Sequence, residues 1–128
     1  MYETALNELR ERWREGHHNV AKEDILRWSA SSGLSVSSVF DRLAIELSSD
    51  FFVGFLGWEF VDLVANRLYG VMFDFADSDP DFINDKNEIV LPSACFEFYC
   101  AFDHSEFEGP RDRELIREFL QKHWTLVG

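Results

Sequence analysis

The stretch WEFVDLVANRLYGVMFDFAD, residues 58–77, decides which fold class the sequence predicts. From Phe60 to Ala76 it carries twelve apolar residues, which fall on nearly every side of a helix. A helix of this kind lies in the middle of a bundle, because a surface helix keeps one polar side. The charged run at 77–81 ends it. We therefore predict a central helix at about 58–77.

Helical patterns also precede and follow this stretch. Apolar residues recur with helical spacing in five further segments, at about 4–15, 20–31, 36–48, 92–105 and 112–124. Residues 49–57 and 77–91 are predicted as connections, the second with a short turn or strand at 88–91. The sequence thus predicts an all-α, single-domain bundle of about six helices, which spans residues 1–128 and surrounds the helix at 58–77.

The composition is typical of a globular protein, and the cysteines and the first residues of the chain predict a cytoplasmic location. Apolar residues make up 46% of the 128 residues and aromatic residues 16%, which is enough for a packed core. We expect no signal peptide, since the first residues lack a basic run followed by an apolar core. Glu59, Asp62 and Arg67 would each cost roughly 2.5–3.5 kcal/mol inside a bilayer, so residues 58–77 are not predicted to span one. Cys95 and Cys100 are predicted to be reduced, buried thiols.

Charge is distributed very unevenly along the chain. The net charge is −12, and residues 43–109 hold 14 acids but only two bases, Arg67 and Lys86. Such a segment repels nucleic acid and anionic membranes, so neither is a predicted partner. It suits a basic protein partner, although it could also serve only to keep the protein in solution.

One polar seam runs along the otherwise apolar stretch. On a helix, Glu59, Asp62, Asn66 and Asp77 fall within about 60° of one another. This seam has three interpretations: the solvated edge of a core helix, a strip that binds a partner, or a Mg²⁺ site. For Mg²⁺, the pairs Glu59/Asp62, Asp74/Asp77 and Asp103/Glu106 could supply carboxylates. Phosphate chemistry would also need bases, which this segment largely lacks.

Three other patterns carry little functional signal. The loop at 77–81 lacks the glycine and the closing glutamate of a calcium loop. The histidines at 17, 18, 104 and 123 show no zinc spacing and no arrangement for nucleophilic catalysis. Residues 22–47 resemble a helix-turn-helix with its turn at 30–36, but the second helix has net charge −1 and no lysine to contact phosphates. We therefore predict no catalytic residues, no metal and no cofactor.

Two short motifs resemble a known group of proteins. They are Trp58-x-Phe60-x-Asp62-x-x-x-Asn66-x-x-Tyr69-Gly70 and Ala101-Phe102-Asp103-x-x-Glu106-Phe107. Over about residues 55–108 the chain is similar to small cytosolic bacterial proteins of the immunity type, which belong to contact-dependent or polymorphic toxin systems. The resemblance implies that the chain binds a cognate toxin domain, often a basic nuclease, and blocks its active site.

The function predicted from these observations is that of a non-enzymatic, immunity-type inhibitor with a basic partner. Carboxylates would steer the encounter, and a few aromatic side chains would supply affinity. The alternatives are a helical interaction or assembly module and, less favoured, a divalent-metal enzyme. The residues predicted to contact the partner are Glu59, Asp62, Asn66, Asp77, Asp79, Asp81, Asp103, Glu106 and Glu108.

Overall fold

The computed structural model describes residues 1–108 and 112–124, and it describes no side chains for residues 104–112. Its elements are α1 (Tyr2–Arg14), α2 (Lys22–Ser32), α3 (Val36–Phe52), α4 (Trp58–Met72), the short 3-10 helix η1 (Pro80–Phe82), α5 (Ser93–Glu108) and α6 (Asp112–His123). The described residues contain no strand, only an isolated bridge between Ile83 and Ile89. The predicted all-α domain of six helices is therefore confirmed.

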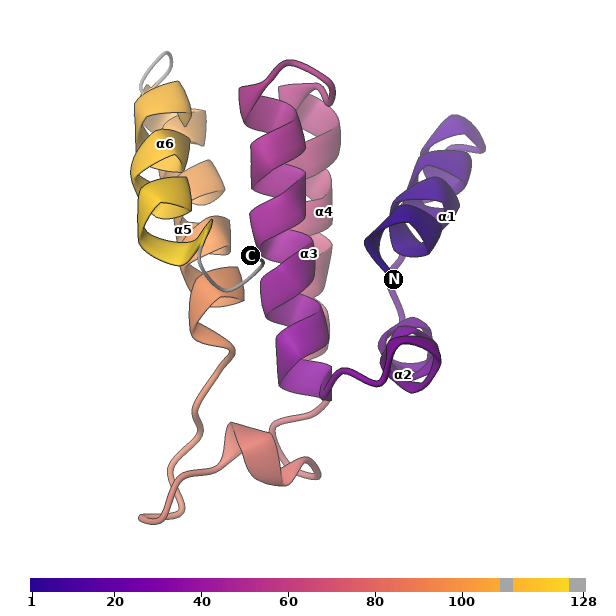
Figure 1. Cartoon of the computed structure of the whole chain (residues 1–128), viewed down its shortest axis with the longest axis vertical. Helices are drawn as coiled ribbons and strands as arrows, with labels where there is room; N and C mark the ends of the chain where they lie inside the picture. The colour runs from indigo at the N-terminus through magenta and orange to yellow at the C-terminus, as the bar shows by residue number, and fades with distance from the viewer. Residues whose placement is uncertain (109–111, 125–128) are drawn as a thin grey trace.

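The central helix is α3, and in this respect the prediction for residues 58–77 was wrong. α3 contacts each of the other α-helices and η1 (Figure 1). Leu43, Ala44 and Ile45 are all fully buried. Because successive residues project about 100° apart, other parts of the protein cover α3 on most of its sides. α3 corresponds to the second helix of the helix-turn-helix pattern considered above. Because α3 is enclosed, its position differs from that of a recognition helix, which lies at the surface and enters a DNA groove.

α4 is shorter than predicted, and this moves Asp77. The regular helix ends at Met72, and a run of tight turns follows, in which Asp74 N bonds to Val71 O and Phe75 N to Met72 O. These turns bring Phe75 into the core, 5.8 Å from the ring of Phe40. The gain from burying this ring explains why the chain leaves the α-helical path. Asp77 consequently lies off the polar seam of α4.

The helices form two flanks around the α3–α4 pair. In Figure 1, α1 and α2 lie on one side of this pair, α5 and α6 lie on the other, and the connection between α4 and α5 extends beyond the end of the bundle. None of the described helices is long and apolar enough to cross a membrane. Cys95 is buried as predicted, whereas Cys100 is exposed, which corrects the prediction for that thiol.

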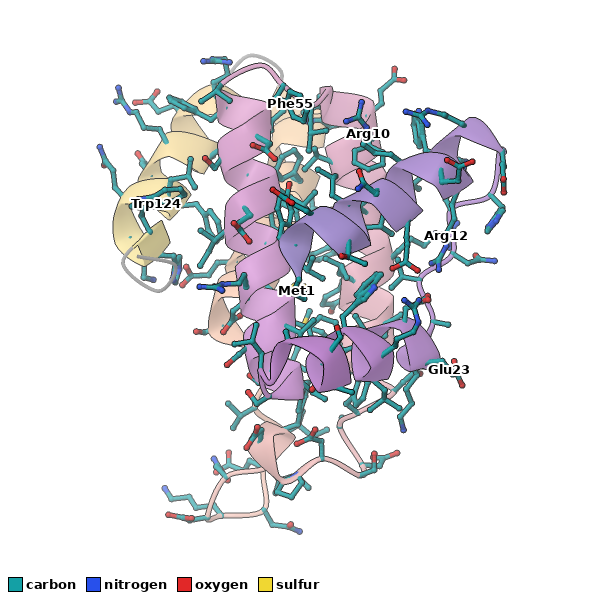
Figure 2. All side chains as sticks on the ribbon, turned by 45° about the vertical axis from the view of Figure 1, so that its right-hand side comes forward. Met1, Arg10, Arg12, Glu23, Phe55 and Trp124 are labelled. Atoms are coloured by element: carbon teal, nitrogen blue, oxygen red, sulfur yellow. The ribbon has the colours of Figure 1, made fainter. Side chains whose placement is uncertain are left out.

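An ion-pair network joins α1 to α2. Arg12 donates to both carboxylate oxygens of Asp24 at 2.8 Å, and Figure 2 shows Arg12 between the two helices. Arg27 pairs with Asp24 and with Glu8, both at 2.9 Å. Glu8 also accepts a 2.6 Å hydrogen bond from the indole nitrogen of Trp28, a fully buried residue. Every acid in this network has an arginine partner.

A second polar cluster holds α5 and α6 in place. Asp41 on α3 accepts a 3.0 Å hydrogen bond from the backbone nitrogen of Cys95, so it satisfies a donor in the first turn of α5. Burial raises the pKa of Asp41. At the end of α6, Glu97 on α5 accepts from Lys122 at 2.5 Å and bonds to the buried His123. We attribute a structural role to this cluster.

Candidate functional site: the α4–α5 face

Two helical stripes lie side by side on the outside of α4 and α5. On α4 the stripe is spaced i, i+4, i+7 and i+11, and on α5 it is spaced i, i+3, i+4 and i+7. We call these eight residues the α4–α5 face: Asp62, Asn66 and Tyr69 from α4, Phe73 from the C-terminal cap of α4, and Phe96, Tyr99, Cys100 and Asp103 from α5. All eight side chains are exposed or half-buried.

Four aromatic rings form the middle of this face. Tyr69 stacks on Tyr99 with ring centroids 3.9 Å apart and planes 7° apart. Phe73 meets Tyr69 edge-on at 5.2 Å, and Phe96 lies 6.2 Å from it. Phe73 is 44% exposed and Phe96 is 40% exposed. These rings therefore join the two helices and still leave a large apolar area in contact with water.

Carboxylates border the rings at one end of the face. Burial raises the pKa of Tyr99, and the nearby charges of Asp103 on α5 and Asp62 on α4 raise it further. The predicted residues Asp62 and Asp103 thus come together around one tyrosine. Burial and Asp103 also raise the pKa of the Cys100 thiol, so this thiol stays protonated at neutral pH and is a weak nucleophile.

Two further predicted residues lie at this end of the face. Asn66 is exposed and donates a 2.9 Å hydrogen bond to the backbone oxygen of Asp62. Glu59 is exposed in the first turn of α4, which lies beside the later turns of α5 because the two helices are antiparallel. In the part of the chain that the structure describes, neither Glu59 nor Asp103 forms an ion pair.

The remaining predicted residues do not belong to this face. Asp77 lies in the turns after α4, and Asp79 and Asp81 lie at η1, where the side chain of Asp79 accepts a 2.9 Å bond from Asp81 N. Met72 lies ten residues after Asp62 on α4, which corresponds to about 15 Å along the helix axis. The three acids follow Met72 in the chain. We call these three residues, which lie at the other end of α4, the second acidic group. The side chains of Glu106 and Glu108 lie outside the described residues.

The α4–α5 face combines aromatic rings with carboxylates. Among the described side chains, no group of three or more His, Cys, Asp or Glu residues lies close enough to hold a metal ion. Arg67 is exposed, but it projects about 160° away from Tyr69 around the axis of α4. The face thus offers ring surfaces and negative charge, and it offers no cation for an anionic ligand.

Sequence reasoning identified the acids of the face but missed its rings. Tyr69 and Tyr99 lie in different helices 30 residues apart, and their stack depends on the antiparallel register of α4 and α5. A signal did exist: Phe96, Tyr99 and Asp103 are spaced i, i+3 and i+7, which places them on one side of a helix. Asn66, Tyr69 and Phe73 have the same i, i+3 and i+7 spacing.

Comparison with known proteins adds no relative to this description. No protein-family model, no curated protein and no solved structure matches the chain. The function must therefore be argued from the chemistry of the α4–α5 face.

Proposed function

We propose that this protein is an immunity-type inhibitor that binds a basic protein partner, such as a toxin nuclease domain, through the α4–α5 face. The observation that carries the proposal is the exposed aromatic cluster of Tyr69, Phe73, Phe96 and Tyr99, bordered by Asp62 and Asp103. Tyrosines in the centre of an interface, surrounded by charge, commonly supply most of the binding energy.

The rings and the acids have different parts in this proposal. A partner that covers Phe73 and Phe96 removes their exposed surface from water, and this stabilises the complex. The acids act earlier, because complementary charge mainly raises the association rate. Glu59 and Asp103 have no ion pair within the described residues, so a cationic partner need not displace an existing one.

The class of partner comes from the resemblance to immunity-type proteins and from the charge. A nuclease that binds phosphates carries lysine and arginine around its active site. An acidic face with exposed rings is complementary to such a surface, and its bulk would block access for the nucleic acid. The second acidic group, Asp77, Asp79 and Asp81, supports the encounter from the end of the bundle.

The proposal is tested with the full chain as bait in an extract of the source cells. We expect a basic protein to be captured at low salt and its association rate to fall steeply as salt rises. Asp103→Lys should slow association by roughly tenfold at low salt. Glu23→Lys, an equal charge reversal on exposed α2, is the matched control and should change the rate by less than about twofold. Equal effects of the two substitutions would contradict binding at this face.

A second candidate function, a helical assembly module, is favoured by one separate observation. The turn between α3 and α4 exposes Val53 by 72% and Phe55 by 59%, and Arg10 lies 5.3 Å above the Phe55 ring. Figure 2 shows Arg10 and Phe55 close together on the surface. If this turn mediates assembly, sedimentation of the purified chain should show oligomers that Phe55→Ser dissociates, while Asp103→Lys leaves them intact.

A further inference from the structure

We infer that the α4–α5 face recognises an arginine side chain of its partner, which stacks on the open side of the Tyr99 ring and pairs with Asp103. This inference rests on the proposed function and adds the chemical group that is recognised. Two features of the face support it, an accessible ring surface and a carboxylate one helical turn away, and together they favour a planar cation.

The ring surface is available because the two tyrosines are not equivalent. Tyr69 contacts three other rings, those of Phe73, Phe96 and Tyr99. Among the described residues, Tyr99 has one ring partner, Tyr69, which stacks on one side of it. Tyr99 is also partly exposed, so part of its ring is accessible to a ligand.

The carboxylate lies within reach of a group on that ring. Asp103 follows Tyr99 by four residues on α5, a spacing that places the two Cβ atoms about 6 Å apart. The side chain of Asp103 is exposed and has no ion pair among the described residues. The negative charge of Asp62 is close enough to act on the same tyrosine. A cation above Tyr99 therefore meets negative charge from both helices.

These two features together favour arginine over lysine. A guanidinium group is planar and weakly hydrated, so it stacks on a ring while its edge donates two hydrogen bonds to a carboxylate. An ammonium group lacks the flat surface and keeps its hydration shell. Elsewhere in this chain cations of both kinds lie over rings, Arg10 at 5.3 Å from the centre of Phe55, Arg113 at 4.8 Å from that of Phe52 and Lys22 at 5.1 Å from that of Phe75, so the preference for arginine depends on the carboxylate beside Tyr99.

The test uses the intact protein and two defined probes, tri-arginine and tri-lysine peptides with blocked ends. Each is titrated at low salt while NMR follows the ring signals of Tyr99 and Tyr69. We expect tri-arginine to shift the Tyr99 signals with an affinity at least about fivefold higher than that of tri-lysine. Because the two peptides carry the same charge, this difference reports on stacking and on the paired hydrogen bonds. Tyr99 should shift more than Tyr69.

Variants separate stacking from charge. Tyr99→Leu should lose the preference for arginine, whereas Tyr99→Phe should keep it, because the ring remains. Asp103→Asn should weaken tri-arginine binding by roughly tenfold, and Asp85→Asn, in the exposed loop before α5, should change it by less than about twofold. Retention of a folded spectrum in each variant excludes a loss caused by unfolding.

Failure of this inference is distinguishable from failure of the proposed function. Equal affinities for the two peptides, or an unchanged preference in Tyr99→Leu, would overturn the arginine assignment, even if Asp103→Lys still slowed capture of a basic partner. Conversely, a captured partner whose binding ignores Asp103→Lys would overturn the proposed function, whatever the peptides show. The two measurements therefore report separately on the group that is recognised and on the surface that binds.

Discussion

The α1–α2 side and the α4–α5 side of this protein each contain an aspartate, and the two aspartates have opposite roles. Asp24 on α2 is buried and paired with Arg12 and Arg27. Asp103 on α5 is exposed beside aromatic rings and forms no ion pair within the described residues. One aspartate therefore holds two helices together, and the other is available to a partner.

The difference follows the local supply of bases. Residues 1–42 hold six bases for seven acids, and Glu8 and Asp24 pair with arginines between α1 and α2. Residues 43–109 hold two bases for 14 acids, and seven of the 12 acids whose side chains are described there are exposed. The net charge of the chain does not distinguish paired acids from exposed ones, because both kinds contribute to it.

The largest expected effect is the loss of Asp24. Asp24→Ala leaves Arg12 without its main partner in a site where the side chains are only 19% (Arg12) and 11% (Asp24) exposed. We expect the free energy of unfolding to fall by about 3 kcal/mol, because an unpaired, partly buried charge is costly. Urea denaturation followed by circular dichroism measures it. A loss below about 1 kcal/mol would mean that the pair behaves like an exposed one.

Acid should remove the same contribution. Burial raises the pKa of Asp24, but hydrogen bonds from Arg12 and from the backbone of Ala21 outweigh this and hold it below its ordinary value of 3.8. The unfolded state therefore binds the proton more readily, and the stability from this pair is lost as pH falls below about 4. The gap between wild type and Asp24→Ala should be full at pH 7 and should shrink as pH falls through the lowered pKa of Asp24. A gap that does not shrink in acid would show that the effect does not depend on charge.

Two other acids shift in the opposite direction. Burial raises the pKa of Asp41 and of Glu46 above their ordinary values of 3.8 and 4.5. Their contribution is present at low pH and is lost as pH rises through the raised values. Comparison of wild type with Asp24→Ala cancels both, which is why the pH experiment is designed as a difference.

A smaller effect is expected at Glu8. Glu8→Ala removes the acceptor for the indole nitrogen of buried Trp28, and an unsatisfied buried donor costs about 2 kcal/mol. Glu8→Gln keeps an acceptor oxygen and loses only the charge, so its cost should be about 1 kcal/mol. Thermal and urea unfolding of the two variants tests this order. Equal losses would assign the whole effect to the ion pair with Arg27.

The smallest effect should come from Asp103, the matched counterpart of Asp24. Asp103→Ala changes an exposed helical position with no ion pair among the described residues, so the free energy of unfolding should change by less than about 0.5 kcal/mol. Partner association should nevertheless slow. A stability loss comparable to that of Asp24→Ala would remove the contrast between the two sides.

The sequence predicts the helices better than their positions in the bundle. The six helical segments follow from spacing alone, but the centre belongs to α3 because α3 contacts both flanks, and this is a property of the assembled fold. Asp77 leaves the seam because burial of Phe75 favours tight turns over a continued helix. The stack of Tyr69 on Tyr99 depends on which helix pairs with α4, and no local pattern specifies that choice.

The division of the α4–α5 face between two helices has a consequence for protein synthesis. α4 is synthesised about 20 residues before α5 begins, and Asp103 follows Phe73 by 30 residues, so at translation rates of about 5–20 residues per second the face stays incomplete for roughly 1.5–6 s. During that interval a nascent chain already carries Asp62 and Tyr69 but lacks Tyr99 and Asp103. A product that stalls in the loop between α4 and α5 would thus be acidic without being competent to bind. Binding competence would then serve as a readout of completed translation through α5.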